Sequence, residues 1–160
     1  MVPVRDYKSL WEFIKTDDPR IDHLFMVDDE TELSNKIEEV SDGDIILVAV
    51  YPASDSQALD EDNLFDVDTC VIYVLQKIEQ RNINDDDLMD ERALTQQILT
   101  HVRETMTTLM FNHVNNTNHR IMKQVIRGKQ HIDRERNYLG CNGWSLSFSL
   151  KTNGINNQTY

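Results

Sequence analysis

The stretch Gly143-Trp144-Ser145-Leu146-Ser147-Phe148-Ser149-Leu150-Lys151 alternates between large apolar residues and serines. Successive side chains of a β-strand point to opposite faces, so this pattern predicts a strand with one apolar face and a row of hydroxyls behind it. A helical period would spread the four apolar residues around the whole cylinder. Burying four such side chains offers roughly 6–12 kcal/mol before conformational entropy is subtracted. We therefore expect the hydrophobic core to form around this strand.

Two further segments are typical of central strands. Ile45–Tyr51 is apolar at both parities, which indicates cover on both faces, and Val67–Lys77 is rich in β-branched and aromatic residues. Ile21–Val27 is short and apolar, so it could be a strand or a buried connector. Pro52 is expected to end the first of these strands, and the acidic, aperiodic segment Ala53–Asp66 is expected to be a mobile loop.

Three segments show helical spacing. The first is expected to be capped by Asp6 and to end before Pro19, and the second to begin at Asp28 or Asp29, with Glu32 completing a weak capping box. The third and longest is expected near Asp87–Val114. The apolar stripes of the three helices are Leu10, Trp11 and Ile14; Leu33, Ile37 and Val40; and Leu94, Ile98, Val102, Met106 and Met110.

The segment Arg120–Arg136 fits either secondary structure. Its apolar residues pair at four-residue spacing, as in a helix, but Gly128 interrupts the pattern and the terminal strand needs a partner. We predict a strand from about His119 to Asp133, paired antiparallel with Gly143–Lys151 through a polar turn at 137–142. The predicted fold is a single α+β domain over residues 1–151. Its mainly antiparallel sheet has about four strands with helices packed on one face, in the order α-α-β-β-α-β-β. Residues 152–160 form a polar tail.

Charge is divided unevenly along the chain, whose net charge is −12. Residues 1–118 hold 9 Lys and Arg against 26 Asp and Glu, whereas residues 119–160 hold 7 against 2. The acidic majority disfavours nucleic-acid binding, whereas a division of charge lets copies attract one another head to tail. Neither a signal peptide nor an apolar run long enough for a membrane helix is found, so a soluble, cytoplasmic protein is expected. Cys70 and Cys141 are expected to be buried free thiols, although a disulfide between them is possible.

The sequence contains no catalytic or ligand-binding motif that we can identify. His101 and Glu104 have the i, i+3 spacing found in carboxylate-bridged metal bundles, but the companion glutamates are missing. The Asp60–Asn63 run resembles a calcium loop only at its start. We predict a protein that is not an enzyme and has no cofactor and no metal. A deep pocket lined by ionisable groups would support the opposite view.

The basic residues of the 120–136 segment could protect a strand edge, or they could bind an acidic partner. The candidate subunit interface comprises these residues together with the acidic loop: Arg120, Lys123, Arg127, Lys129, Asp60, Glu61 and Asp62.

The closing segment Leu139-Gly140-Cys141-Asn142-Gly143-Trp144-Ser145-Leu146-Ser147-Phe148-Ser149-Leu150 resembles the ends of small prophage structural proteins. The order of the predicted elements is also similar to tail-terminator and head–tail joining proteins of long-tailed phages. This resemblance implies a non-enzymatic subunit that forms a homo-oligomeric ring with other virion proteins at the tail end or the head–tail junction. It carries over no catalytic residues. The alternative is an acidic binding module, such as an immunity protein that neutralises a basic partner.

Overall fold

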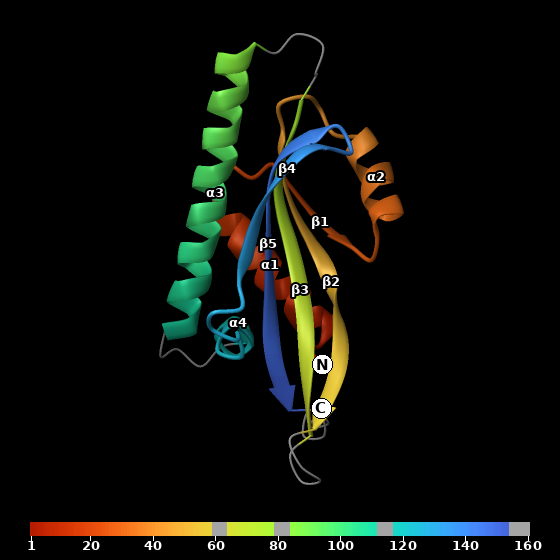
Figure 1. The fold of residues 1–160 in the computed structure, drawn as a ribbon, viewed down its shortest axis with the longest axis vertical. Helices are drawn as coiled ribbons and strands as arrows, with labels where there is room; N and C mark the ends of the chain where they lie inside the picture. Colours follow the sequence, from red (N-terminus) through yellow and green to blue (C-terminus); the bar gives the residue numbers. More distant parts are fainter. Residues whose placement is uncertain (59–63, 79–83, 112–116, 154–160) are drawn as a thin grey trace.

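A computed structural model describes residues 1–58, 64–78, 84–111 and 117–153. In these ranges the elements are α1 (Val4–Asp17), β1 (His23–Val27), α2 (Glu30–Glu38), β2 (Ile45–Ala58), β3 (Leu64–Lys77), α3 (Asp85–Phe111), α4 (Thr117–Met122), β4 (His131–Tyr138) and β5 (Cys141–Asn153). The strands form one sheet in the order β1-β2-β3-β5-β4, shown in Figure 1. All neighbouring strands are antiparallel except β1 and β2, which are parallel. The prediction of a single α+β domain with a mainly antiparallel sheet is confirmed.

The alternating strand lies in the sheet as its sequence predicts. Leu146, Phe148 and Leu150 are fully buried in β5, next to α1, α3 and α4. Trp144 is half-buried at the edge of the same cluster, and its indole Nε1–H donates to the carbonyl oxygen of Arg92 in α3 at 3.2 Å. The serines of β5 are half-buried on the opposite face of the sheet. The alternation in β5 thus places its large apolar side chains in the main core and its serines on the other face of the sheet.

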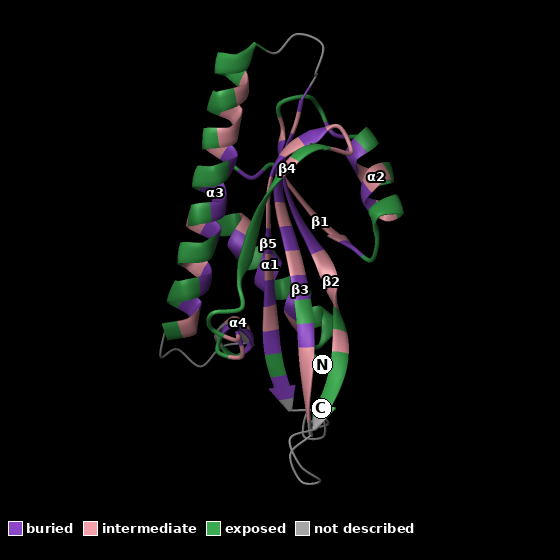
Figure 2. Ribbon diagram, viewed as in Figure 1, coloured by how far each residue is buried: buried purple, intermediate pink, exposed green. Residues whose placement is uncertain are grey.

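Helices cover both faces of the sheet, which differs from the predicted one-sided arrangement. The larger core joins α1, α3 and α4 to one face, through Leu47 of β2 and Val74 of β3 among others. A smaller core joins Leu33 and Ile37 of α2 to the other face of the same strands. Ile45–Ala49 is buried at every position, so β2 supplies apolar side chains to both cores (Figure 2). Because β1 pairs in parallel with β2, the chain must cross over between them, and α2 is that crossover.

The local start signals of α2 are as expected. The Asp29 side chain accepts a hydrogen bond from the backbone N–H of Glu32 at 2.8 Å, and the Glu32 side chain accepts one from the N–H of Asp28 at 3.0 Å. At α1, by contrast, Pro3 is the N-cap residue and Asp6 lies within the first turn. Proline suits that boundary because its missing N–H would have no intrahelical acceptor there.

The expected loop at residues 53–66 is largely sheet. β2 runs on to Ala58 and β3 begins at Leu64, and the two are paired as far as Ala58 and Leu64. Pro52 does not end β2, because the register shifts between Val50 and Ala53 and a bulge tolerates a residue without an N–H. The acidic residues Asp60, Glu61 and Asp62 lie outside the described residues.

The predicted strand from His119 to Asp133 is wrong over most of its length. Residues 117–122 form α4, and the sheet strand β4 begins only at His131. Ile121 and Met122 are both buried in the main core. Adjacent residues of a helix lie about 100° apart around its axis, so both can face one core, whereas adjacent residues of a strand point to opposite faces. β4 pairs antiparallel with β5 through a turn at Leu139 and Gly140, so the hairpin itself is confirmed.

The end of the chain also differs from the prediction. Thr152 is buried and β5 extends to Asn153, so the polar tail begins later than residue 152. The rest of the expected tail, residues 154–160, lies outside the described part of the chain.

Candidate interaction surfaces

A group of exposed cations lies beside the lower end of β5. Arg120 belongs to α4, Lys123 follows it directly, and Arg127 and Lys129 lie in the turn before β4. The chain between these residues is fixed to the edge of β5. The backbone N–H of Ile126 donates to the carbonyl oxygen of Ser149 at 2.8 Å.

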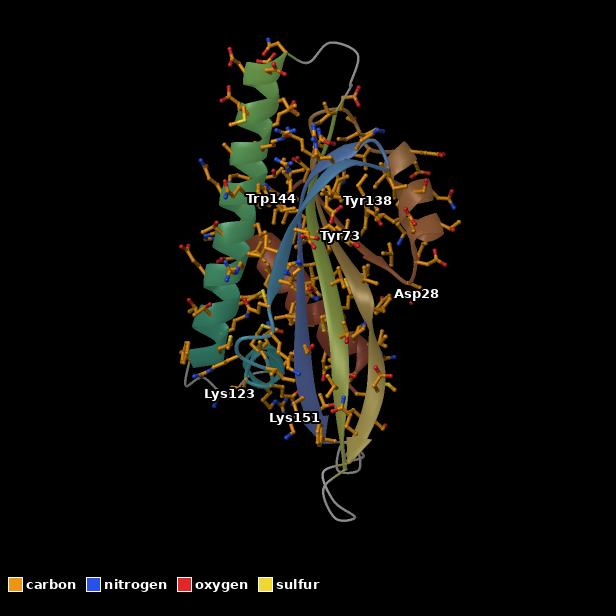
Figure 3. All side chains as sticks on the ribbon, viewed as in Figure 1. Asp28, Tyr73, Lys123, Tyr138, Trp144 and Lys151 are labelled. Carbon is orange, nitrogen blue, oxygen red and sulfur yellow. The ribbon has the colours of Figure 1, made fainter. Side chains whose placement is uncertain are left out.

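Lys151 of β5 joins this group. Its backbone N–H donates to the carbonyl oxygen of Gln124 at 2.8 Å, and Val125 forms an isolated bridge with Leu150. Figure 3 shows Lys123 and Lys151 toward the same end of the molecule. We call Arg120, Lys123, Arg127, Lys129 and Lys151 the basic surface. Sequence reasoning did not include Lys151 because only the pairing of 124–126 with β5 brings it there.

Aromatic rings from other elements contact two of these cations. The Arg127 guanidinium lies 4.8 Å from the ring centroid of Phe111, at the end of α3, and the Lys151 ammonium lies 4.2 Å from that of Phe65 in β3. Both distances are within cation–π range. The basic segment has no aromatic residues of its own between Arg120 and Arg136, so tertiary contacts supply rings that the local pattern lacks.

An acidic surface surrounds α2. Between residues 28 and 44 the chain holds eight carboxylates and one lysine. That lysine, Lys36, lies 2.8 Å from Glu32 and donates to the carbonyl oxygen of Met26. The pKa of Glu32 is lowered, first by its bond from Lys36 and then by the N–H of Asp28. We call the exposed remainder the acidic surface: Asp28, Asp29, Glu30, Glu38, Glu39 and Asp42.

A pocket of about 200 Å³ lies between the first turn of α2 and the sheet. Its floor includes Tyr73 of β3 and Tyr138 of β4, whose rings are stacked with centroids 5.2 Å apart and planes 12° apart. Figure 3 shows the two tyrosines between the sheet and the α2 side of the molecule. The remaining lining residues are Val27, Asp29, Glu30, Leu33 and Val50.

The shape of the β4–β5 hairpin explains why Tyr138 reaches this place. The register shifts between Glu135 and Tyr138, and Asn137 has a positive φ of 51°. A bulge bends and twists a strand, and the hairpin curves over toward α2 (Figure 1). The backbone N–H of Asn137 donates to the side chain of Asn142 at 2.7 Å, which stabilises the bend. The bend directs the Tyr138 ring onto Tyr73.

The electrostatic environment of the pocket is negative. Burial raises the pKa of Tyr138, and the pKa is raised further by Tyr73, Glu30 and Glu135. The pKa of Tyr73 is also raised, first by burial and then by Glu135 and Glu30, although its hydrogen bond with Tyr138 opposes the change. Both phenols therefore stay protonated at neutral pH, and the two carboxylates favour a cation in this pocket.

A buried carboxylate connects the start of the chain to the two long strands. Asp68 of β3 is fully buried and accepts hydrogen bonds from the N–H of Val2 at 2.9 Å and the hydroxyl of Thr152 at 3.3 Å. The Met1 ammonium lies 3.8 Å from Asp68 and 2.9 Å from Asp66. These contacts hold the end of β5 in place beside the basic surface.

The histidine singled out for its spacing has carboxylate neighbours from two helices. His101 Nε2 lies 3.1 Å from Asp17 of α1, and its Nδ1 lies 3.9 Å from Glu104. Asp17 also accepts a hydrogen bond from the hydroxyl of Thr105 at 2.8 Å. These contacts link α1 to α3. Across the described ranges we find no group of three or more His, Cys, Asp or Glu side chains arranged to hold a metal ion.

The two cysteines lie on opposite faces of the sheet, which separates them. Cys70 belongs to the main core and Cys141 to the core under α2. Burial raises the pKa of Cys70 to about 12 and that of Cys141 to about 11. Both are free thiols, so the alternative of a disulfide between them is excluded by this fold.

Comparison with models of protein families finds none that matches the chain, and comparison with curated proteins finds no matching sequence. In the part of the chain that the structure describes, no helix combines the length and the apolar character needed to cross a bilayer.

Proposed function

We propose that this chain is a non-enzymatic structural protein of phage type. In this proposal it forms a homo-oligomeric ring at the tail end or the head–tail junction, together with other virion proteins. It is made in the cytoplasm and enters the virion on assembly. It binds no cofactor and recognises no specific nucleic acid.

The observation that carries the proposal is the separation of charge across the subunit. The basic surface lies beside α4 and the end of β5, whereas the acidic surface lies around α2. In Figure 3, Lys123 and Asp28 are on opposite sides of the molecule. A ring requires a heterologous interface, in which one side of a subunit meets a different side of the next. Two separate surfaces of opposite charge satisfy that requirement, whereas a two-fold dimer needs one self-complementary patch.

The acidic side of this interface has two candidates. Asp60, Glu61 and Asp62, suggested by the sequence, lie outside the described residues and stay a prediction, so the proposal rests on the described carboxylates around α2. The resemblance of the closing segment to prophage proteins supplies the phage-type setting.

Native mass spectrometry and sedimentation velocity test the proposal. We expect one closed oligomer at low ionic strength and weaker association at about 0.5 M salt, because exposed charges are then screened within a few ångströms. Changing Arg127 and Lys129 together to glutamate should reduce association, whereas Lys8→Glu on α1 should not. A chain that stays monomeric at every salt and protein concentration would contradict the proposal.

A second candidate function is favoured by the density of charge around α2. With eight carboxylates and one lysine between residues 28 and 44, this surface suits a basic protein partner, as in an immunity protein. Tight one-to-one binding to such a partner would favour this function if Glu38→Lys and Glu39→Lys weaken it. Neutralising the basic surface would then leave binding unchanged.

A further inference from the structure

We propose that the pocket between α2 and the stacked tyrosines receives the Lys129 side chain of a neighbouring copy of this chain. We call it the acid–tyrosine pocket, lined by Val27, Asp29, Glu30, Leu33, Val50, Tyr73 and Tyr138. This inference rests on the proposed homo-oligomer and names the contact that would fix its register.

The pocket has the chemistry of a site for one organic cation. Valine and leucine side chains and two aromatic rings suit an aliphatic stem, and Asp29 and Glu30 provide negative charge beside them. Tyrosine rings attract a cation through their π-systems. At about 200 Å³ the pocket is smaller than sites that bind drug-sized ligands, which start near roughly 300 Å³. Its size therefore fits a single side chain.

The carboxylate of Glu30 is available for such a contact. Glu30 is exposed, and no hydrogen bond or ion pair of its side chain is found among the described residues, whereas Glu32 is paired with Lys36. Asp29 uses Oδ1 to cap α2, which leaves Oδ2 as a second acceptor. Burial is the first cause of the raised pKa of Tyr73 and Tyr138, and Glu30, together with Glu135, raises it further because the carboxylates make the surroundings of both hydroxyls negative.

Lys129 is the cation best placed to enter a neighbour's pocket. It follows Gly128, which has a positive φ of 82°, and a Cβ built at Gly128 would meet no other atom within 4 Å. Lys129 is exposed, and no ion pair of its ammonium group occurs within the described ranges. Arg127, on the other side of the glycine, is instead held against Phe111. A lysine also carries the long aliphatic stem that the apolar lining accommodates.

A charge exchange within one chain tests this contact. Glu30→Lys and Lys129→Glu should each weaken self-association about tenfold, because each places two like charges at the interface. In the chain carrying both changes, the dissociation constant of self-association should return to within about threefold of the wild-type value. Every interface then again pairs one ammonium, now at position 30, with one carboxylate, now at position 129. Glu38→Lys combined with Lys8→Glu, which lie outside the pocket and the turn, should show no such recovery. Sedimentation equilibrium provides the dissociation constants.

The outcomes separate this inference from the proposed function. A wild type that assembles, with no recovery in the double variant, overturns the Lys129 contact and leaves the ring intact. If Lys123→Glu weakens self-association more than Lys129→Glu does, the Lys129 contact is overturned as well.

A second arm does not depend on assembly. The peptide Val125–His131 is titrated into the full chain under conditions where the chain is monomeric, and the ring resonances of Tyr73 and Tyr138 are followed by NMR. We expect both to shift with wild-type chain and not with Glu30→Lys. Unchanged tyrosine resonances at millimolar peptide would overturn the inference.

Discussion

Gly143 is the residue of β5 at which a small change should have the largest effect. It is buried and lies opposite Leu75 of β3 on one side and Glu135 of β4 on the other. A Cβ built there would overlap the carbonyl oxygen of Val74 and lie 2.9 Å from its carbonyl carbon. These are backbone atoms of a paired strand, so they cannot rotate away as a side chain would. We therefore expect Gly143→Ala to force β3 and β5 apart.

The expected cost follows from opposing effects. Overpacking of a close-packed interior costs about 1–3 kcal/mol, and occasionally more when backbone must move. Replacing glycine by alanine also restricts the unfolded chain, which offsets about 0.4–1 kcal/mol. Because the overlap here is with main chain, we expect a cost at the top of the range, about 3 kcal/mol, and after the offset a net loss of about 2–2.6 kcal/mol. For a domain of this size that corresponds to a fall in Tm of roughly 4–10 °C.

Urea unfolding monitored by tryptophan fluorescence measures this loss. Gly140 provides a matched control, because it has a positive φ of 77° and nothing within 4 Å of the added Cβ. Gly140→Ala should cost about 1 kcal/mol through backbone strain alone, and Gly140→Asn should recover much of it. At Gly143, asparagine should be at least as harmful as alanine, because steric overlap is the cause. A Gly143→Ala variant within about 0.5 kcal/mol of the wild type, the range typical of surface changes, would refute this reasoning.

Three further predictions concern the core and its charges. Phe148→Ala should cost about 3–5 kcal/mol in urea unfolding, because the ring is 1% exposed, and a loss below about 1 kcal/mol would contradict its place in the core. Burial alone would raise the pKa of Asp18, but hydrogen bonds from the side chain and backbone of Arg20 lower it. Asp18 therefore contributes stability above its unfolded pKa near about 3.9, and that contribution is lost as pH falls through its lower folded pKa. Arg20→Gln should thus cost about 1–2 kcal/mol at about pH 7, allowing for the exposed guanidinium, and progressively less as the pH falls below about 3.9. A loss of stability that does not change with pH would count against the ion pair. Cys70 and Cys141 should resist a thiol reagent at about pH 8 until urea unfolds the chain, and rapid labelling of the native protein would show that one of them is accessible.

Local sequence patterns determined the elements in which one side is apolar and faces the core while the other side is polar. The alternation from Trp144 to Leu150 predicts its strand because the pleat converts parity directly into two faces. The spacing of Ile98, Val102 and Met106 predicts α3 for the same kind of reason, since each helical turn returns to the same side. The capping signal at Asp29 acts within one turn and needs no distant partner.

Tertiary structure alone decided how these pieces are combined. Residues 117–122 are helical, and the core beneath them accepts Ile121 and Met122 together. The four-residue spacing of apolar residues in Arg120–Arg136 agrees with this helix, but Gly128 and the need of the terminal strand for a partner favoured a strand. The parallel pairing of β1 with β2 requires a crossover, and α2 provides it on the face opposite the main core. The short apolar run Ile21–Val27 does not encode this long-range pairing.

The candidate surfaces depend on the same kind of long-range pairing. Lys151 joins the basic surface through the register of β5 with residues 124–126, and Tyr138 reaches Tyr73 through a bulge in β4. Parity and helical spacing are properties of neighbouring residues and can be seen in the sequence. Strand order, register and the bend of a hairpin depend on which distant surfaces bury one another, and only the folded chain decides them.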